Sequence, residues 1–584
     1  MTPFIILVPL LVAIFAIALD RSYSRAKYVA AAAALLSLAL FPLVGSGTQS
    51  TSWFSVGSTS ITLTTSVQPL NSLLLLVVMA IGVLIMVYSW GYMNLPSEQK
   101  RYYIEMLAFE AAMLTFAMAG DFIVLFIAWS FLSMTSYLLI GFWSNRERAT
   151  AAARKAITVV LIGDIALLAA IVMFQNIFGS LQFSVILSGI GGNPVAALPV
   201  ALLFVAVMAK SAQFPLQEWL ADAMEGPTPV SAYLHSSTMV KAGVFIVLVL
   251  FPLFQAAGLL QAILVIGAIT VSIAIFAAAT ENHVKRVLAY STVEELGLML
   301  VAIASNALLA AIYFFFVQSF YKALLFFSAG ASMKATDSEN LDEIKGMSSN
   351  KLLLITTVFG VLALAGFVPF GGFFADVGLD YAFSTNLVTY ALISLVSLTT
   401  SFFIFRWFFL QARKGANRQA QLNYSATPRS MSYSMAILAV AALASSAVFF
   451  LVSGIFTGEG GLPIGSSLTM SDAVIETALV AIGAAIGFFL YLRKRKTAQP
   501  NRLTRPAYTA RAVNAAYFHF AGFVEAIAEA MDYTDMKING AFDWVGHFTI
   551  GIARGARRFA SGSINAYVAL FAIGMVVLVI VVVI

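Results

Sequence analysis

Cysteine is absent from the sequence, and charged residues are scarce. The 584 residues contain no cysteine, which excludes disulfide bonds, cysteine-held iron–sulfur clusters and c-type haem on this chain. Charged residues make up 10% of the chain and hydrophobic residues 61%, whereas a soluble domain usually carries about 25% charged residues. This composition predicts an all-α polytopic membrane protein. It argues against a soluble enzyme and against a nucleic-acid binder.

Sequence patterns for metal and nucleotide binding are also missing. The four histidines are His235, His283, His519 and His547, and none lies at a metal-ligand spacing from another. Neither GxxxxGK[ST] nor GxGxxG occurs, so these phosphate-binding motifs are excluded. We therefore expect no metal, redox cofactor or nucleotide on this chain.

Long apolar runs predict about sixteen membrane helices, because one span needs about 20 mostly apolar residues. The predicted spans are 3–19, 28–46, 70–92, 103–119, 122–143, 156–177, 197–217, 229–251, 257–279, 287–303, 308–333, 351–374, 386–408, 431–454, 472–492 and 563–584. Basic residues follow the first run and no small-residue cleavage site precedes them, so we interpret it as a retained helix rather than a signal peptide.

The basic residues predict the orientation. Every Lys and Arg except Lys210, Lys241 and Lys322 lies in or beside the loops that follow the odd-numbered spans, or in segment 493–562. Cytoplasmic loops collect Lys and Arg, so both termini are predicted to lie outside. The lack of a transit peptide favours a multi-pass protein of a prokaryotic plasma membrane.

Three segments outside the spans carry weaker signals. Residues 508–560 have apolar positions at helical spacing, which predicts an amphipathic lateral helix on the cytoplasmic side; a cytosolic linker is the alternative. Residues 47–69 alternate Ser and Thr with apolar residues, which favours a small hairpin. Asp121 is expected to cap a helix at the outer surface.

Ionisable side chains at membrane depth are energetically costly and therefore indicate function. The candidate proton-path residues are Lys210, Glu110, His235, Lys241, Lys322, Asp164, Glu294, Glu295 and Asp376. We expect Glu110 to pair with Lys210, and Lys210 to exchange protons with Lys241, His235 and Lys322 along a hydrated midplane. Static ion pairs, and a solvated Asp376, are the structural alternatives.

Two spans contain helix-breaking prolines, Pro215 in span 7 and Pro369 in span 12. These spans lie five apart and so run in opposite directions, as an inverted repeat of spans 4–8 and 9–13 would place them, although two unrelated kinks are the alternative. Such paired breaks point to the ion path of a transporter. The predicted regions are 1–102 (helices 1–3), 103–255 and 256–410 (two five-helix half-channels), 411–492 (helices 14–15), 493–562 (amphipathic segment) and 563–584 (final anchor).

The segment KSAQFPLQEWLADAMEGPTPVSAYLHSSTMVKAGVF at 210–245 resembles the signature of the antiporter-like proton-translocating subunits of complex I-type oxidoreductases and of multisubunit sodium/proton antiporters. Further similar stretches are SYLLIGFW at 136–143, KRVLAYSTVEELGLM at 285–299, FYKALLF at 320–326 and TSFFIFR at 400–406. The predicted C-terminal layout, with a fifteenth span, an amphipathic segment and a last span, is most similar to the distal subunit L of complex I.

The resemblance implies roles for individual residues. Lys210 matches the span 7 lysine of the family's proton site, His235 the span 8 histidine, and Lys322 the central-axis lysine of span 11. Asp164 matches an acid of span 6.

The sequence also departs from the family, most clearly at Ser130 and Asp376, and Phe314 and Gln318 stand where the family has histidines in span 11. Ser130 follows Trp129 where the family has a glutamate, and Asp376 stands in the place of the span 12 lysine. The resemblance therefore implies a first half-channel rewired through Glu110, and it leaves transport by the second half-channel open.

The main functional hypothesis is a proton-translocating membrane subunit of a complex I-like respiratory oxidoreductase, driven by quinone or methanophenazine reduction elsewhere in the assembly. The resemblance implies other antiporter-like and small membrane subunits as partners, with quinone, flavin and iron–sulfur clusters in partner subunits. The alternatives are a sodium/proton antiporter subunit, the membrane partner of an ion-coupled hydrogenase or inorganic-carbon uptake complex, and a non-pumping clamp that acts through 508–560.

Overall fold

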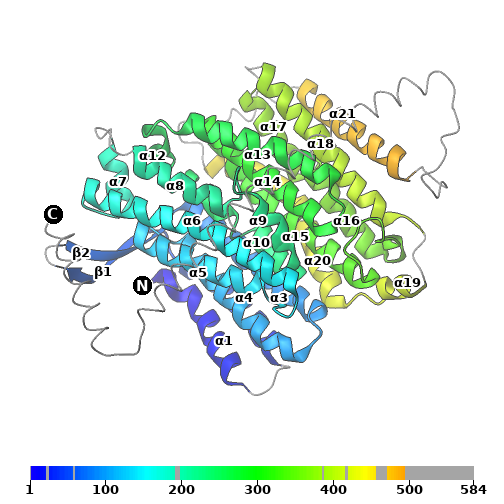
Figure 1. Cartoon of the computed structure of the whole chain (residues 1–584), viewed down its shortest axis with the longest axis horizontal. Coiled ribbons are helices and arrows are strands. Elements are labelled where there is room, and N and C mark those ends of the chain that lie inside the picture. Colours follow the sequence, from blue (N-terminus) through cyan, green and yellow to red (C-terminus); the bar gives the residue numbers. More distant parts are fainter. Residues whose placement is uncertain are drawn as a thin grey trace, which may run out of the picture. The chain divides into compact units, whose positions relative to one another are not determined.

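The computed structural model describes residues 2–20, 25–56, 59–190, 197–383, 387–414, 418–455 and 470–492. Over these residues the protein is a bundle of helices with one small hairpin (Figure 1). The predictions for segment 493–562, for the last span 563–584 and for His519 and His547 lie outside the described residues.

The N-terminal part holds the hairpin between short and long helices. Its elements are η1 (Thr2–Leu7), α1 (Val8–Leu19), α2 (Ala26–Ala39), η3 (Phe41–Leu43), β1 (Gly47–Val56), β2 (Thr59–Val67) and α3 (Pro69–Tyr92). Strands β1 and β2 pair in antiparallel fashion, with Gly47 opposite Val67, which confirms the predicted hairpin.

The central part contains the helices that carry most of the candidate site. They are α4 (Pro96–Ala117), α5 (Phe122–Ile140), α6 (Glu147–Phe178), α7 (Phe183–Gly189), α8 (Ala197–Lys210), α9 (Glu218–Asp222), η6 (Ala223–Glu225), α10 (Thr228–Ser236), α11 (Lys241–Val249), α12 (Phe251–Ala256), α13 (Leu260–Thr280), α14 (Val284–Ala304) and α15 (Leu308–Thr336). The Asp121 carboxylate caps α5, accepting from the amides of Ile123 at 2.9 Å and Val124 at 2.7 Å, which confirms the predicted cap; its location at the outer surface stays a prediction. Helix α6 packs along α8, and α13 packs along α14 (Figure 1).

The last part of the described chain continues the bundle. Its elements are η7 (Met347–Ser349), α16 (Lys351–Leu364), α17 (Gly371–Phe383), α18 (Leu387–Ala412), α19 (Arg418–Ser425), α20 (Arg429–Ile455), α21 (Met470–Gly487) and the single π-helical turn η8 (Phe488–Leu492). Helix α18 packs against α21.

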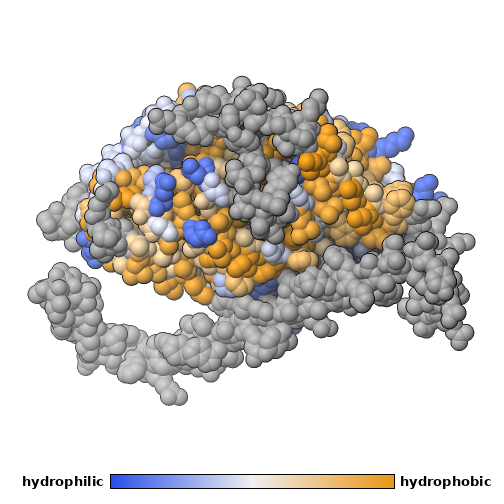
Figure 2. Space-filling view, turned by 90° about the horizontal axis from the view of Figure 1, so that it is seen from above, coloured by the Kyte–Doolittle hydropathy of each residue, from blue (hydrophilic) through white to orange (hydrophobic). Residues whose placement is uncertain are grey.

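The predicted class, an all-α polytopic membrane protein, is confirmed. Within the described part of the chain, ten helices are long and apolar enough to cross a membrane. Large apolar side chains such as Phe15, Ile165 and Val440 are exposed, and Figure 2 shows broad apolar areas on the visible face, as expected for a surface solvated by lipid. The total of sixteen spans and the inverted repeat stay predictions.

Breaks between helices interrupt three of the predicted spans or end them early. Helix α8 ends at Lys210 and α9 begins at Glu218, with Pro215 between them; α16 ends at Leu364 and α17 begins at Gly371, with Pro369 between them. Both prolines follow cis peptide bonds. The predicted span 229–251 is also divided, because α10 ends at Ser236 and α11 begins at Lys241. No proline lies within this third break, and it was not predicted from the sequence.

Candidate functional site

The first cluster surrounds Lys210, the last residue of α8, whose side chain is fully buried. Its Nζ donates to the Ser133 hydroxyl at 2.6 Å and to the Trp129 carbonyl at 3.1 Å. It also lies 3.8 Å from Asp164 Oδ1 and 4.6 Å from the centroid of the Trp129 ring. An ion pair, two hydrogen bonds and a cation–π contact therefore converge on one buried ammonium group.

Asp164 on α6 is held in place by groups of α5. The Trp129 indole donates to Oδ1 at 2.7 Å, and the Ser133 hydroxyl donates to Oδ2 at 2.8 Å. Because an ammonium group can only donate, the Ser133 hydroxyl accepts from Lys210 and donates its own hydrogen to Asp164. Lysine, hydroxyl and carboxylate thus form a continuous hydrogen-bonded chain.

The expected Glu110–Lys210 pair is wrong. Glu110 on α4 is fully buried, but neither of its carboxylate oxygens has a hydrogen-bond partner among the described residues. Glu110 instead lies beside Gly82 and the Tyr233 hydroxyl, since a Cβ built on Gly82 would meet both groups within 3 Å. Lys210 leaves the end of α8 toward α5 and α6, so Asp164 becomes its partner.

The second cluster centres on Lys322 of α15 and Glu295 of α14. Lys322 Nζ lies 2.9 Å from Glu295 Oε2 and donates to the Ser291 hydroxyl at 2.5 Å. The Gln318 amide and the Tyr321 hydroxyl each donate to the same carboxylate at 2.9 Å. Glu295 therefore accepts from three donors on a single face of α15.

Lys241, at the first turn of α11, contacts α15, the helix that carries Lys322. Its Nζ donates to the Phe315 carbonyl and to the Ser319 hydroxyl, and the Phe315 ring lies 4.6 Å away. No carboxylate forms an ion pair with Lys241 within the described ranges, although Glu295 and Lys322 both act on it electrostatically. Neutral groups thus hold this fully buried lysine.

His235, at the end of α10, has mostly aromatic surroundings. The rings of Trp219 and Phe326 lie 6.5 Å and 6.1 Å from its imidazole. Its Nδ1 is buried and has no hydrogen-bond partner in the part of the chain that the structure describes. Direct hydrogen bonds therefore do not join His235 to Lys210 or Lys241 there, and proton transfer between them would need water.

The remaining acids meet at a small cavity of about 20 Å³, which is room for about one water molecule. Its walls include Glu294, Glu295 and Asp376. Glu294 accepts from the Thr400 hydroxyl through Oε1, whereas its Oε2 has no partner among the described residues. The structure thus brings the predicted acids of spans 10 and 12 together.

Sequence reasoning missed several residues of these clusters. Glu476 on α21 is buried and interacts electrostatically with Asp376; its position inside predicted span 472–492 was the available signal. Ser133 and the Trp129 indole complete the Lys210 cluster, and Ser319 holds Lys241. Serines are common in membrane helices, so their sequence positions alone did not single them out.

Two family profiles match the chain. Residues 119–403 match the family described as NADH:quinone oxidoreductase/Mrp antiporter, TM. Residues 53–103 match the family described as NADH-Ubiquinone oxidoreductase (complex I), chain 5 N-terminus. The first match contains both lysine clusters. The chain belongs to this family of antiporter-like membrane subunits, and the resemblance to subunit L-type chains is confirmed.

Curated relatives carry matching names. NAD(P)H-quinone oxidoreductase subunit 5, chloroplastic, of Chaetosphaeridium globosum is 32% identical over 451 residues, which are 73% of this chain and 66% of that protein. NAD(P)H-quinone oxidoreductase chain 5 of Synechocystis sp. is 33% identical over 383 residues, 62% of this chain and 56% of that protein. The chain therefore spans somewhat less than two thirds of the length of these relatives.

Two solved structures share the fold. A chain of the Mrp complex from Dietzia sp. DQ12-45-1b superposes with a TM-score of 0.71 at 22% identity, covering 99% of this chain and 63% of that chain. A chain of the membrane-bound sulfane sulfur reductase, an archaeal respiratory membrane complex, gives a TM-score of 0.74 at 20% identity, covering 99% of this chain and all of that chain. At these identities the likeness establishes the fold.

Proposed function

We propose that this chain is the proton-translocating membrane subunit of a complex I-like respiratory oxidoreductase. It couples quinone or methanophenazine reduction, carried out in other subunits, to proton export. The observation that carries this proposal is the Lys210–Ser133–Asp164 chain, a fully buried ammonium group hydrogen-bonded at a helix break. Ionisable groups held in this way inside a membrane protein mark proton relays.

The mechanism is electrostatic. A charge change in a neighbouring subunit shifts the balance between Asp164 and Lys210, and Lys210 then releases or takes up a proton. Lys241 receives the proton through water, since neutral groups hold it and no carboxylate fixes its charge. The Lys322–Glu295 pair and the cavity beside Glu294 and Asp376 continue the route.

The surroundings of the chain follow from the same proposal. Other antiporter-like and small membrane subunits flank it, and the quinone, flavin and iron–sulfur clusters reside in partner subunits, so no redox step occurs on this chain. The protein lies in a prokaryotic plasma membrane with its basic loops in the cytoplasm and both termini outside. The amphipathic segment then lies along the cytoplasmic side.

The test is proton pumping by the assembled complex with Lys210→Ala. We expect electron transfer to continue while the proton-pumping rate falls about 10²-fold, the lower range for a positioned proton-transfer group. Lys351→Ala is the matched control, since it removes an exposed lysine at the start of α16. Unchanged pumping by an assembled Lys210→Ala complex would exclude the proposed role.

A subunit of a multisubunit sodium/proton antiporter is the second candidate, because the matching family description names the Mrp antiporter alongside the oxidoreductase. In that case the ion gradients drive transport and no electron donor is needed. Sodium-dependent proton flux in vesicles without a donor would favour this function. Flux that requires the donor would favour the oxidoreductase.

A further inference from the structure

The small cavity beside Glu294 brings several carboxyl groups together inside the protein. Its polar walls include Glu294 and Glu295 of α14, Asp376 of α17 and Thr400 of α18. Helix α18 packs against α14, α16 and α17 (Figure 1). With a volume of about 20 Å³, the cavity holds about one water molecule or one ion of similar size.

Protein cations balance only part of the negative charge around this cavity. Lys322 Nζ lies 2.9 Å from Glu295 and forms an ion pair with it. Among the described residues, no basic side chain forms an ion pair with Glu294 or with Asp376. Glu294 is buried, and its Oε2 has no hydrogen-bond partner in the same part of the chain. A buried carboxylate left in this state is costly, so another positive charge or a proton must neutralise it.

The C-terminal end of α16 adds negative potential to the same cavity. This helix ends at Leu364, and both Leu364 and Ala365 line the cavity. The Asp376 carboxylate lies against Gly366, in the break that follows the helix. Because the last carbonyl groups of a helix carry a partial negative charge, an acid at this end is unfavourable unless a cation or a proton accompanies it.

The first proline break shows how the chain neutralises such an end elsewhere. Helix α8 has Lys210 in its last turn, and the ammonium group lies 3.8 Å from Asp164. The last turn of α16 has no basic residue, and Asp376 lies at this break. At the first break the protein therefore supplies the positive charge itself, whereas at the second break an ion from solution can supply it.

We propose that this cavity is a binding site for a sodium ion, held by Glu294 Oε2, the Asp376 carboxylate and neutral oxygen atoms at the end of α16. In transporters, the C-terminal ends of broken helices coordinate sodium ions in this way. The described part of the chain contains no group of three acidic or histidine side chains arranged to hold a metal ion. Two carboxylates in so small a space suit a monovalent ion better than Ca²⁺, which takes about six to eight oxygen ligands.

The small cavity and its anionic ligands also favour sodium over the larger potassium ion, because selectivity depends on cavity size and on the field of the ligands. This inference goes beyond the proposed function, since binding requires neither electron transfer nor pumping. Sodium and the proton compete for the same carboxylate oxygens, so the ion occupies part of the proposed proton route. Only that consequence rests on the proposed function.

The first experiment is infrared difference spectroscopy of the purified complete chain in lipid bilayers. Sodium in the buffer is exchanged for potassium at constant pH and ionic strength. We expect sodium to shift carboxylate stretching bands, and Glu294→Gln and Asp376→Asn each to abolish that shift. Glu110→Gln is the matched control, because it removes another fully buried carboxyl group that does not line the cavity, and it should retain the shift.

Two results would overturn the site. One is a sodium-dependent shift that persists in Glu294→Gln and in Asp376→Asn. The other is a wild-type spectrum that does not distinguish sodium from potassium, as expected if protons alone neutralise the acids. Asp376→Asn decides the matter if Glu294→Gln fails to accumulate in the membrane. The measurement needs no turnover, so it separates failure of the site from failure of the proposed function.

The second experiment replaces the ion with a tethered ammonium group. Wild type should melt at a higher temperature in sodium than in potassium, because an ion that binds only the folded protein stabilises it. Asp376→Lys should lose this dependence on sodium. In sodium-free buffer we expect Asp376→Lys to melt at a higher temperature than Asp376→Asn, because its ammonium group neutralises Glu294 and the end of α16. The reverse order would show that this position does not require a positive charge.

Discussion

At the scale of single residues, the three buried lysines of the candidate site, Lys210, Lys241 and Lys322, differ in what holds them. Lys210 and Lys322 each contact a carboxylate and a serine hydroxyl, whereas Lys241 contacts a hydroxyl and a carbonyl. A buried ammonium group without an adjacent counter-charge is much more costly than a paired one. Lys241 is therefore suited to carry a proton briefly, and the paired lysines to hold one.

The partner of Lys210 can be tested with double-mutant cycles. We expect Lys210→Met and Asp164→Asn to show a coupling free energy of about 1–3 kcal/mol in unfolding stability, because the two side chains share an ion pair and a serine. Lys210→Met and Glu110→Gln should be additive within about 0.5 kcal/mol. Stability of the purified protein in detergent is the measurement. A larger coupling in the Glu110 cycle would instead restore the pairing that the sequence suggested.

Glu339 lies between α15 and η7, outside the membrane spans, and its contribution to folding stability depends on pH. Its hydrogen bond with His283, 3.1 Å long, lowers the pKa of the Glu339 carboxyl from the ordinary 4.5 to about 2. A carboxyl group whose pKa is lower in the folded state than in the unfolded state stabilises the fold at pH values above its unfolded-state pKa. This stabilisation is lost as the pH falls through the folded-state pKa. We therefore expect the melting temperature to drop between pH 4.5 and about pH 2, and Glu339→Gln to lessen that drop.

The control for this prediction lies on the same connection. Asp342→Asn removes an exposed acid and should leave the drop in place. The expected effect is modest, because the Glu339 side chain is 45% exposed and solvent screens its interaction with His283. Identical pH profiles for wild type and Glu339→Gln would contradict the assigned role of this pair.

Sequence reasoning identified the buried ionisable residues but not all of their contacts. Lys210 and Asp164 were recognisable because each interrupts an apolar run. Which acid meets Lys210 depends on the direction in which its side chain leaves α8 and on how closely α6 approaches. Neither quantity is encoded in local spacing, so Glu110, which also lies in an apolar run, was an equally reasonable partner.

At the scale of secondary-structure elements, the helix breaks place the charged clusters. Lys210 ends α8 and Lys241 begins α11, so both ammonium groups lie where backbone hydrogen bonding is interrupted. The first break follows from Pro215, which cannot continue a helix. The break before Lys241 occurs in Ser237–Val240 without a proline or glycine. There the Thr238 hydroxyl donates to the Tyr233 carbonyl, and the Ser211 hydroxyl donates to the Val240 carbonyl. A helix-breaking residue therefore marks the first break but not the second.

Close packing of α6 on α8 sets the geometry of the Lys210–Asp164 pair. A Cβ added at Gly163 would lie 2.7 Å from the Ala209 Cβ and 3.2 Å from the Ala206 Cα, so Gly163→Ala must push the helices apart. We expect a cost of about 1–3 kcal/mol in stability, as for overpacked cores, together with slower proton pumping. Gly487→Ala in α21 is the control, since its nearest contacts are 3.4 Å away. Equal stability of the two variants would contradict this account.

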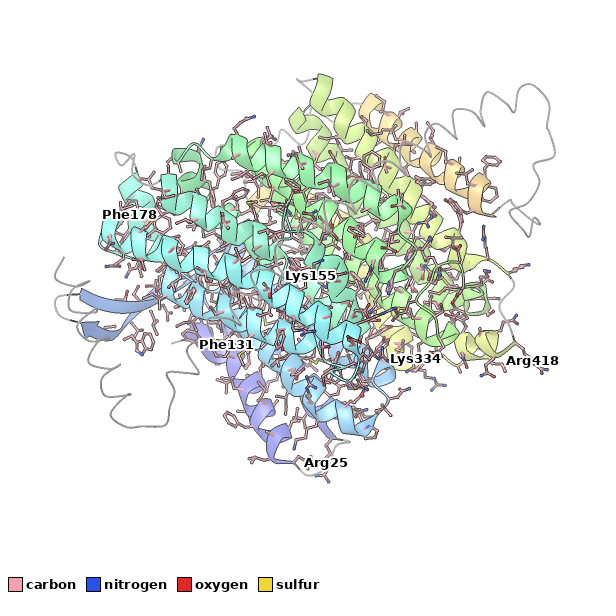
Figure 3. The ribbon with its side chains drawn as sticks, in the orientation of Figure 1. Arg25, Phe131, Lys155, Phe178, Lys334 and Arg418 are labelled. Atoms are coloured by element: carbon pink, nitrogen blue, oxygen red, sulfur yellow. The ribbon has the colours of Figure 1, made fainter. Side chains whose placement is uncertain are left out.

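At the scale of the whole described bundle, charge is distributed asymmetrically. Arg25, Lys334 and Arg418 lie on one side, and the far end of α6 at Phe178 lies on the other (Figure 3). The predicted orientation depended on the same asymmetry along the sequence, where only the three mid-span lysines fall outside the basic loops. Loop charge can be read without knowledge of packing, so the sequence supports a prediction of the orientation, whereas it does not identify side-chain partners.

The absence of cysteine makes this orientation directly testable. Ser348→Cys places a thiol at an exposed position of η7, near the basic residue Lys345, and Ser52→Cys places one at an exposed position of β1. Because basic loops stay in the cytoplasm, a membrane-impermeant thiol reagent should label Ser52→Cys in intact cells. It should label Ser348→Cys only in inverted vesicles or after permeabilisation. The reversed pattern would show that the protein lies in the membrane with the opposite orientation.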